Sequence, residues 1–438
     1  MCSTVLTTLG GSGAISADGS RERLRILHIN DTYGRGGGGG TEQSVPNTCA
    51  LLEARGHITA VLYGRDTGLD PSDRTRPVAH IPGLCQFQLR LDPAIMQQAL
   101  AWIGRFAPDV VHLHQVNNAH LVQAIVRHWP TVFFVHNHLL NCPSGIRYWR
   151  TTGTVCPHTG PGAHCVFNAY LRHCNVRRPG HVVRSLLSCA SSRRFARLVT
   201  HLAVDSTYMR DMLVTAGIPR DAITILPTVT ELPDEHVLRP YPRDPMVLFV
   251  GRLSEEKGVH CLLQAIPYLR TPCRLVIAGD GYYRPALERL ARQLNLSNVE
   301  FAGWVLKPDL AAYYGAASVV VVPSVYPEPL GLVGPEAMAH ARPVVAFPLG
   351  GIPDWLRHGE TGLAARPGDP VDLARQIDTL LQQPALAAAM GQAGRRLVEQ
   401  EFHPQRYVDR LERVYALVRQ QWEARRTRAV AAPERTVV

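Results

Sequence analysis

Residues 24–30 read LRILHIN and residues 246–250 read MVLFV. Both are short apolar runs of the kind that form strands buried on both faces of a parallel sheet. Each run opens a series in which similar runs alternate with longer amphipathic stretches. Further runs of the two series lie at residues 58–63, 109–114 and 131–135, and at 275–278, 318–322 and 343–347. This strand–helix alternation predicts parallel sheets covered by helices.

The pattern predicts an α/β protein with two Rossmann-like, doubly wound parallel-sheet domains. A segment with four prolines, ELPDEHVLRPYPRDP at residues 231–245, interrupts both series and marks the boundary between them. The expected organisation is a disordered N-terminal arm at 1–22, a first domain at 23–236, a second domain at 243–402, a C-terminal helix at 403–425 placed to pack back on the first domain, and a tail at 426–438.

Composition excludes several classes of protein. The chain has 438 residues, of which 46% are hydrophobic and 19% charged, and this balance argues against wholesale disorder and against a polytopic membrane protein. No apolar window reaches membrane-spanning length, and no basic residues precede the first short apolar run, so we expect a cytoplasmic protein. The net charge of +10 suits an anionic ligand or a phospholipid surface. No basic face interleaved with aromatic residues supports nucleic-acid binding.

A glycine-rich loop follows the first expected strand. Residues 31–43 read DTYGRGGGGGTEQ, with six glycines between Gly34 and Gly40. Glycines let the backbone approach a ligand closely, and the N-terminus of a following helix favours an anion. The loop lacks the G-x-G-x-x-G spacing of dinucleotide-binding proteins. A flexible loop without a ligand is the alternative interpretation.

Two cations follow the first strand of the second series. In FVGRLSEEKGV, residues 249–259, Arg252 and Lys257 come directly after the strand. Ligands of open parallel sheets bind outside the carboxyl ends of the strands, where two cations could clamp a diphosphate. A solvated charge cluster that includes Glu255 and Glu256 is the alternative.

A pair of glutamates follows the run SVVVVPS. Residues 325–339 read VYPEPLGLVGPEAMA, in which Glu328 and Glu336 flank a glycine-bearing turn. A strand, a turn and a helix beginning near Pro335 would place Glu328 at the floor of a pocket and aim the turn amides at an anion. Glu336 beside Pro335 is also ordinary chemistry for the start of a helix.

Together these motifs resemble the retaining, nucleotide-sugar-dependent glycosyltransferases of family 4, which have the GT-B architecture of two Rossmann-like domains facing across a cleft. The resemblance rests on FVGRLSEEKGV, IAGDG at 277–281, EPLGLVGPEAMA, LGGIPD at 349–354 and HGETGL at 358–363. It covers nearly all of the second domain. Weaker support in the first domain comes from the glycine loop, PDVVHLH and FVHN.

The resemblance implies roles for residues of the second domain. Arg252 and Lys257 match the pair that holds the donor diphosphate. Glu336 matches the glutamate that accepts from the ribose hydroxyls, and Glu328 the one beside the donor sugar. Backbone amides that would face the sugar and the phosphates belong to Gly331, Leu332 and Val333.

The resemblance also assigns three residues of the first domain. Gly39 and Gly40 fall where the loop glycines approach the diphosphate and the acceptor. His136, at the end of TVFFVHN, matches a histidine that faces the transferred sugar. A histidine at the end of a strand can instead be a satisfied core residue.

The implied reaction moves a sugar from a nucleoside diphosphate donor to a hydroxyl of a saccharide or lipid-linked glycan, with retention at the anomeric carbon. No Asp-x-Asp motif occurs in the corresponding loops, so we expect no cofactor or divalent ion to be required for catalysis. The alternatives are a GT-B nucleotide-sugar epimerase or hydrolase, or a non-catalytic protein that binds sugar nucleotides.

A cysteine-rich insertion at 142–174 follows His136 on the acceptor side. It contains Cys142, Cys156, Cys165 and Cys174. Four thiolates suit a structural zinc ion, but the spacings lack tight C-x-x-C pairs, so free thiols or a disulfide are the alternatives. The basic run from residue 172 to 194 could meet an anionic lipid headgroup, which would place the protein peripherally at the inner membrane face, or it could be a solvated surface.

Overall fold

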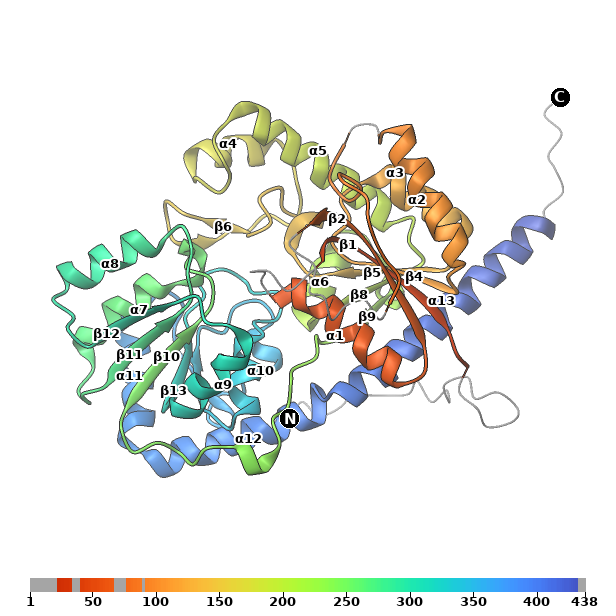
Figure 1. The fold of residues 1–438 in the computed structure, drawn as a ribbon. Coiled ribbons are helices and arrows are strands. Elements are labelled where there is room, and N and C mark those ends of the chain that lie inside the picture. Colours follow the sequence, from red (N-terminus) through yellow and green to blue (C-terminus); the bar gives the residue numbers. More distant parts are fainter. Residues whose placement is uncertain (1–21, 34–39, 67–75, 89–90, 432–438) are drawn as a thin grey trace.

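The computed structural model describes residues 22–33, 40–66, 76–88 and 91–431. Two separate sheets, each parallel throughout, dominate these residues (Figure 1). The first sheet has the strand order β3-β2-β1-β4-β5-β8-β9. Its strands, in chain order, are β1 (Arg25–Tyr33), β2 (Ile58–Asp66), β3 (Val78–His80), β4 (Val110–Leu113), β5 (Thr131–Val135), β8 (His201–Val204) and β9 (Ile223–Ile225).

The second sheet repeats this plan with the order β12-β11-β10-β13-β14-β15. In both sheets the strand order reverses beside the first strand, at β1/β4 and at β10/β13, which is where ligands of doubly wound folds bind. The predicted fold class of two Rossmann-like α/β domains is confirmed. The strands are β10 (Met246–Val250), β11 (Arg274–Ala278), β12 (Val299–Gly303), β13 (Val319–Val322), β14 (Val344–Ala346) and β15 (Gly362–Ala364).

Helices cover both faces of each sheet, and several begin at side-chain caps. Asp92 accepts a hydrogen bond from the amide of Ala94, and Asn118 from that of Leu121, so each satisfies an amide that the first helical turn leaves unpaired. The helices are α1 (Gly40–Ala54), α2 (Pro93–Phe106), α3 (Ala119–His128), α4 (Ala163–Leu171), α5 (Pro179–Ala196), α6 (Thr207–Thr215), α7 (Val259–Ala265), α8 (Arg284–Gln293), α9 (Lys307–Ala316), α10 (Val333–Ala339), α11 (Pro370–Gln382), α12 (Pro384–Glu401) and α13 (Pro404–Ala431). None of those in the described part of the chain could cross a bilayer.

The last helix, α13, follows the second domain in sequence but packs on the first sheet (Figure 1). Tyr407, Leu411 and Tyr415 share one buried cluster with Ile26 of β1 and Phe134 of β5. The helix continues to Ala431, past the expected end at residue 425, because no proline or glycine interrupts residues 405–431. The C-terminal helix therefore completes the core of the first domain.

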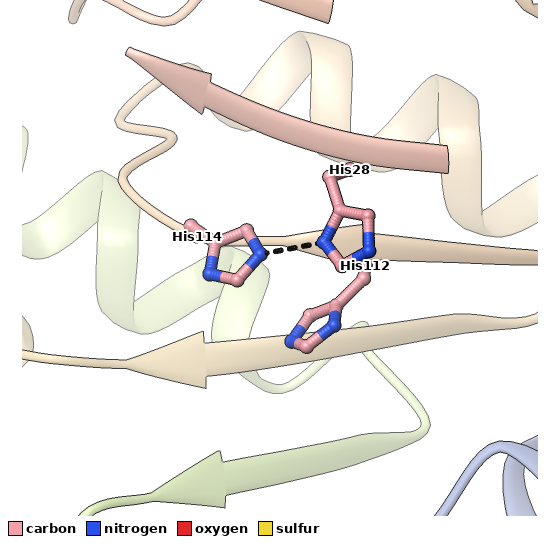
Figure 2. A group of neighbouring side chains, drawn as sticks. All are labelled: His28, His112 and His114. Carbon is pink, nitrogen blue, oxygen red and sulfur yellow. Dashed lines mark hydrogen bonds between the residues drawn. The ribbon is translucent and has the colours of Figure 1, made fainter. Parts of the chain in front are cut away.

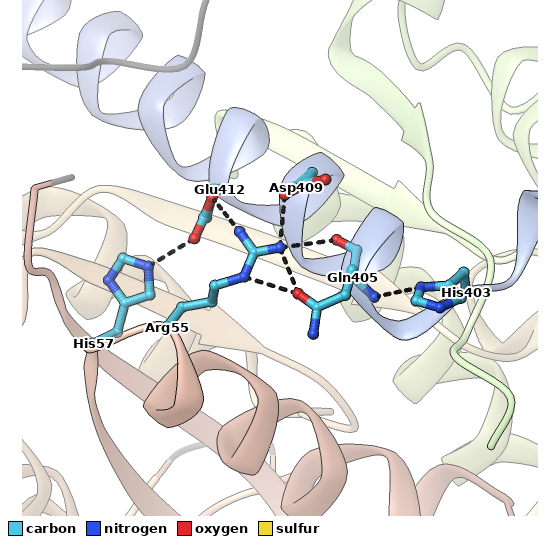
Figure 3. A network of polar contacts seen from close by, with 6 residues as sticks. All are labelled: Arg55, His57, His403, Gln405, Asp409 and Glu412. Atoms are coloured by element: carbon cyan, nitrogen blue, oxygen red, sulfur yellow. Dashed lines mark hydrogen bonds and ion pairs between the residues drawn. The ribbon is translucent and has the colours of Figure 1, made fainter. Parts of the chain in front are cut away.

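A polar network fastens α13 to the end of α1 (Figure 3). The Arg55 guanidinium donates to Oε1 of Gln405 at 2.7 Å and to Oδ1 of Asp409 at 2.8 Å. His57 Nε2 lies 3.1 Å from Oε1 of Glu412. Only 14% of the Arg55 side chain is exposed, so water screens these bonds weakly.

We expect Arg55→Ala to lower the free energy of unfolding by about 2 to 3 kcal/mol, because it leaves partly buried carboxylates without their cation. Urea unfolding measures this loss. Arg419→Ala is the control, since Arg419 pairs with the half-exposed Glu22 and should contribute at most about 1 kcal/mol. Equal losses in the two variants would contradict the role of Arg55 as the anchor of α13.

Candidate active site

Two loops at the carboxyl ends of β10 and β13 cross closely. After β10 the chain forms a short 3₁₀ helix, η5 (Glu255–Lys257), and turns at Gly258 with φ of 69°. A Cβ on Gly258 would collide with the carbonyl oxygen of Pro323, which follows β13, so only glycine fits. The amide of Val325 donates to the carbonyl of Glu256 at 3.0 Å. This crossing brings Lys257 to Glu328.

Lys257 and Glu328 form a partly buried ion pair. Lys257 Nζ lies 2.7 Å from Oε1 of Glu328, whose side chain is 5% exposed. The hydroxyl of Ser324 donates to Oε1 at 2.6 Å, and that of Tyr326 to Oε2 at 2.7 Å. Burial alone would raise the pKa of Glu328, but Lys257 and the two hydroxyls hold it below its ordinary value. Glu328 is therefore an ionised carboxylate at neutral pH.

Arg252 differs from Lys257 in having no internal partner. Its side chain is exposed, and no carboxylate in the described part of the chain pairs with it. Arg252 is close enough to Tyr326 to lower the pKa of that phenol, although burial raises it overall. Arg252 therefore lies near the tyrosine that donates to Glu328, and its exposed guanidinium is available to an anion.

Glu336 lies on α10, behind the glycine-bearing turn. Gly331 has φ of 80°, and α10 begins two residues later, so the amides of Leu332 and Val333 belong to its first turn. The Tyr314 hydroxyl donates to Oε2 of Glu336 at 2.9 Å. Burial raises the pKa of Glu336, and Lys307 opposes this rise.

Both lysines of the chain act on these two glutamates. Lys257 and Lys307 are the only lysines among 46 basic residues. Lys257 contacts Glu328 directly, whereas Lys307 pairs with Glu231 at 2.8 Å and lowers the pKa of Glu336 from a distance. One ammonium group therefore contacts Glu328 directly, and the other acts on Glu336 only through the longer reach of its charge.

The first domain contacts the Glu328 loop through two residues that the sequence did not point to. His138, in the 3₁₀ helix η2 (His138–Leu140), places Nε2 2.7 Å from the carbonyl oxygen of Pro327. Ser206, at the cap of α6, donates to the carbonyl of Pro329. These contacts fix the residues on both sides of Glu328 against the first domain.

His136 lies at the end of β5, buried between partners of its own domain. Its Nδ1 is 3.4 Å from Oδ2 of Asp205, and its Nε2 is 3.2 Å from Nδ1 of His114. Phe134 stacks on its ring at 4.0 Å between centroids. Both ring nitrogens therefore have partners inside the protein.

The His136 contact continues into a stack of buried histidines (Figure 2). His28 Nδ1 lies 3.0 Å from His114 Nε2, and His112 stacks on His114 at 4.2 Å. Burial lowers the pKa of His28 to about 3 and the pKa values of His112 and His114 well below the usual range, so all three are neutral. Three possible metal-ligand atoms lie within 4.8 Å, but hydrogen bonds already occupy a nitrogen of every ring.

The glycine-loop prediction is only partly within the described residues. Gly39 lies outside them, and Gly40 is the first residue of α1. A helix N-terminus therefore follows β1 directly after the glycine run, at the carboxyl edge of the first sheet. The dipole of α1 would favour an anion there.

The four cysteines gather around a small hairpin of β6 (Tyr148–Trp149) and β7 (Thr154–Val155). Burial, followed by repulsion from the thiolates of the other three, raises the pKa of Cys174 to about 12. Tetrahedral zinc would hold thiolates about 3.8 Å apart. No three of these sulfurs lie within 4.8 Å of one another in the described structure. The structure does not form a closed zinc site, and zinc binding stays a prediction.

The hairpin also reaches the second domain. Tyr148 is buried in the core that contains Leu253 and Val259. Arg150 donates to the Tyr282 hydroxyl at 2.9 Å and to Oε2 of Glu255 at 3.4 Å. The insertion therefore contacts the same loop that carries Lys257.

The fold and the site define a GT-B glycosyltransferase. The family model described as Glycosyltransferase Family 4 matches residues 38–232, and the one described as Glycosyl transferases group 1 matches residues 244–383. The chain belongs to glycosyltransferase family 4.

Similar proteins agree with this assignment. A glycogen synthase of Mycobacterium tuberculosis is 27% identical over 423 residues, which cover 90% of this chain and 94% of that protein. An uncharacterized glycosyltransferase of Methanocaldococcus jannaschii is 42% identical over 139 residues, but the match spans only 35% of its length. The crystal structure of Anabaena HepE in complex with UDP and glucose has a TM-score of 0.66 at 18% identity and covers 90% of this chain and 100% of that chain.

We expect Lys257→Ala to lower the free energy of unfolding by about 2 kcal/mol at neutral pH, because it leaves the buried Glu328 carboxylate unpaired. Without Lys257, burial should raise the pKa of Glu328 above its unfolded value. As the pH falls, protonation of Glu328 removes the unpaired buried charge from the variant and so reduces its loss of stability. In the wild type, protonation of Glu328 instead removes the stability that its low pKa contributes at neutral pH. The difference between the two proteins should therefore shrink toward about pH 4.5.

Urea unfolding at both pH values tests this prediction. Lys307→Ala is the matched control, since its 2.8 Å pair with Glu231 is exposed and should contribute at most about 1 kcal/mol. A stability difference for Lys257→Ala that stays constant with pH would rule out its control of the Glu328 charge.

Proposed function

We propose that this protein is a retaining glycosyltransferase that transfers a sugar from a nucleoside diphosphate donor to a hydroxyl of a saccharide or lipid-linked glycan. The observation that carries the proposal is the ionised Glu328, held by Lys257 beside the unpaired Arg252 at a contact between the two domains. Family membership supports sugar transfer, and the complexes of HepE with UDP and with UDP-glucose support a nucleotide-sugar donor.

In the proposed complex, Arg252 and Lys257 hold the donor diphosphate. Charge-assisted hydrogen bonds from fixed cations would stabilise the negative charge that develops as the bond between the anomeric carbon and the phosphate oxygen breaks. Glu336 would accept from the ribose hydroxyls, and amides of Gly331, Leu332 and Val333 would face the sugar and phosphates. Glu328 would orient Lys257 and lie beside the sugar.

Retention of configuration fits a front-face reaction. A double displacement would need a carboxylate free to attack the anomeric carbon, but both oxygens of Glu328 already accept hydrogen bonds. We therefore propose that the acceptor oxygen forms its bond on the face that the diphosphate leaves, and that its proton passes to the leaving phosphate oxygen. His136 and Gly40 would border the acceptor side, and protein cations would take the place of a divalent ion.

Nucleotide sugars should stabilise the protein against heat, and one of them should support transfer. At 100 times its dissociation constant a donor adds about 2.7 kcal/mol of stability, which a thermal-shift panel detects. A transfer assay with the best donor, with and without a chelator, should give the same rate. Loss of transfer on chelation would contradict the metal-free clamp, and donor turnover that needs no acceptor would indicate a hydrolase or epimerase.

Arg252→Ala should lower the transfer rate about 100-fold, since it removes one cation from the leaving diphosphate. It should change the free energy of unfolding by less than about 0.5 kcal/mol, because the exposed side chain has no internal carboxylate partner. Steady-state kinetics and urea unfolding measure the two effects. Arg289→Ala, at an exposed arginine of α8, is the control, and wild-type transfer by Arg252→Ala would refute its role.

A further inference from the structure

Exposed apolar side chains gather on α4 and on the first half of α5. In the described part of the chain thirteen large apolar side chains are exposed, and seven of them lie between residues 166 and 187. Single exposed apolar residues are ordinary on protein surfaces, but such a concentration marks an interaction surface. The seven are Val166, Phe167, Tyr170, Leu171, Val176, Val183 and Leu187.

Helical spacing puts these residues on common faces. Four of them recur on α4 at positions i, i+1, i+4 and i+5, and the two within α5 are four residues apart. Phe167 is 65% exposed and Leu171 is 70% exposed, whereas Ala169 is the one buried residue of α4. The apolar face of α4 is therefore turned away from the protein. We call α4 and residues 176–187 the α4–α5 surface.

The α4–α5 surface carries positive charge that no acid balances. Between Asp109 and Asp205 the chain contains no aspartate or glutamate. Seven arginines lie between residues 172 and 197, at positions 172, 177, 178, 184, 193, 194 and 197. None of them pairs with a carboxylate elsewhere in the described residues, and Arg177 and Arg178 are exposed. Uncompensated cations beside exposed apolar groups favour an anionic partner with an apolar interior.

Figure 1 shows α4 and the start of α5 along the upper edge of the molecule, outside both sheets. Further along, α5 packs against η2, the 3₁₀ helix that carries His138. The surface is thus built on the chain segment that leads out of the candidate active site.

We propose that the α4–α5 surface docks on an anionic phospholipid bilayer. Phe167 and Leu171 enter the boundary between headgroups and acyl chains, and Arg177 and Arg178 meet lipid phosphates. A second copy of the chain is a poorer occupant, because pairing the two surfaces would bring two sets of unbalanced arginines together. The docking does not depend on the proposed sugar transfer, since it needs neither donor nor turnover.

Co-sedimentation of the full chain with vesicles tests the proposal. The wild type should bind vesicles of phosphatidylcholine mixed with phosphatidylglycerol, bind pure phosphatidylcholine far more weakly, and be released by salt. The variants F167S/L171S and R177Q/R178Q should each bind the anionic vesicles about tenfold more weakly. Matched controls in the second domain are Tyr268→Ser, at a residue 57% exposed, and Arg289→Gln.

Each outcome decides the question. Wild-type protein that stays off anionic vesicles, or surface variants that bind as well as the controls, would overturn the proposal. A dimer that forms without lipid and dissociates in F167S/L171S would assign the surface to a second copy instead. Thermal unfolding checks that the variants fold, and if F167S/L171S does not, R177Q/R178Q alone decides, because both of its arginines are exposed.

Discussion

The ion pair between Lys257 and Glu328 organises the junction of the two domains. It forms only because the loops after β10 and β13 cross at Gly258, where no side chain fits. Its carboxylate is saturated by Ser324 and Tyr326, and the prolines on either side accept hydrogen bonds from His138 and Ser206 of the first domain. The buried charge is stable because both carboxylate oxygens accept hydrogen bonds, two on Oε1 and one on Oε2, and these bonds fix both loops.

Much of the fold could be predicted from the sequence, because central strands such as β5 and β13 are continuous apolar runs. The three-residue strands β3, β9 and β15 could not, since so short a segment has no period, whereas the equally short β14 could because it lies in the apolar run at residues 343–347. Arg252, Lys257 and both glutamates stand out because they follow strands. Tyr314 and His138 could not be identified from the sequence. Each is far along the chain from its partner, Glu336 or Pro327, and the contact forms only when the elements pack together.

Charged residues are distributed unevenly along the chain: the lysines lie in the second domain, and one long stretch of the first domain contains no acid. Of the only two lysines, Lys257 contacts Glu328 and Lys307 pairs with Glu231, while the acid-free stretch of the first domain, residues 110–204, has arginine and histidine as its basic residues. Buried histidines of this stretch such as His112 stay neutral, so they pack as aromatic rings and do not add to the positive charge. The exposed arginines of the same stretch stay protonated, so they give this part of the surface its positive charge.

The position of α13 constrains how the domains can move. The chain passes from the first domain to the second through residues 231–245, and returns at Pro404 to complete the first core. The two crossings lie side by side, since the amide of Thr230 donates to the carbonyl of Phe402 at 3.5 Å, so a rotation between the domains would bend both at one hinge. A protease that nicked one crossing would leave both pieces associated, because the returning helix would remain embedded beneath the sheet.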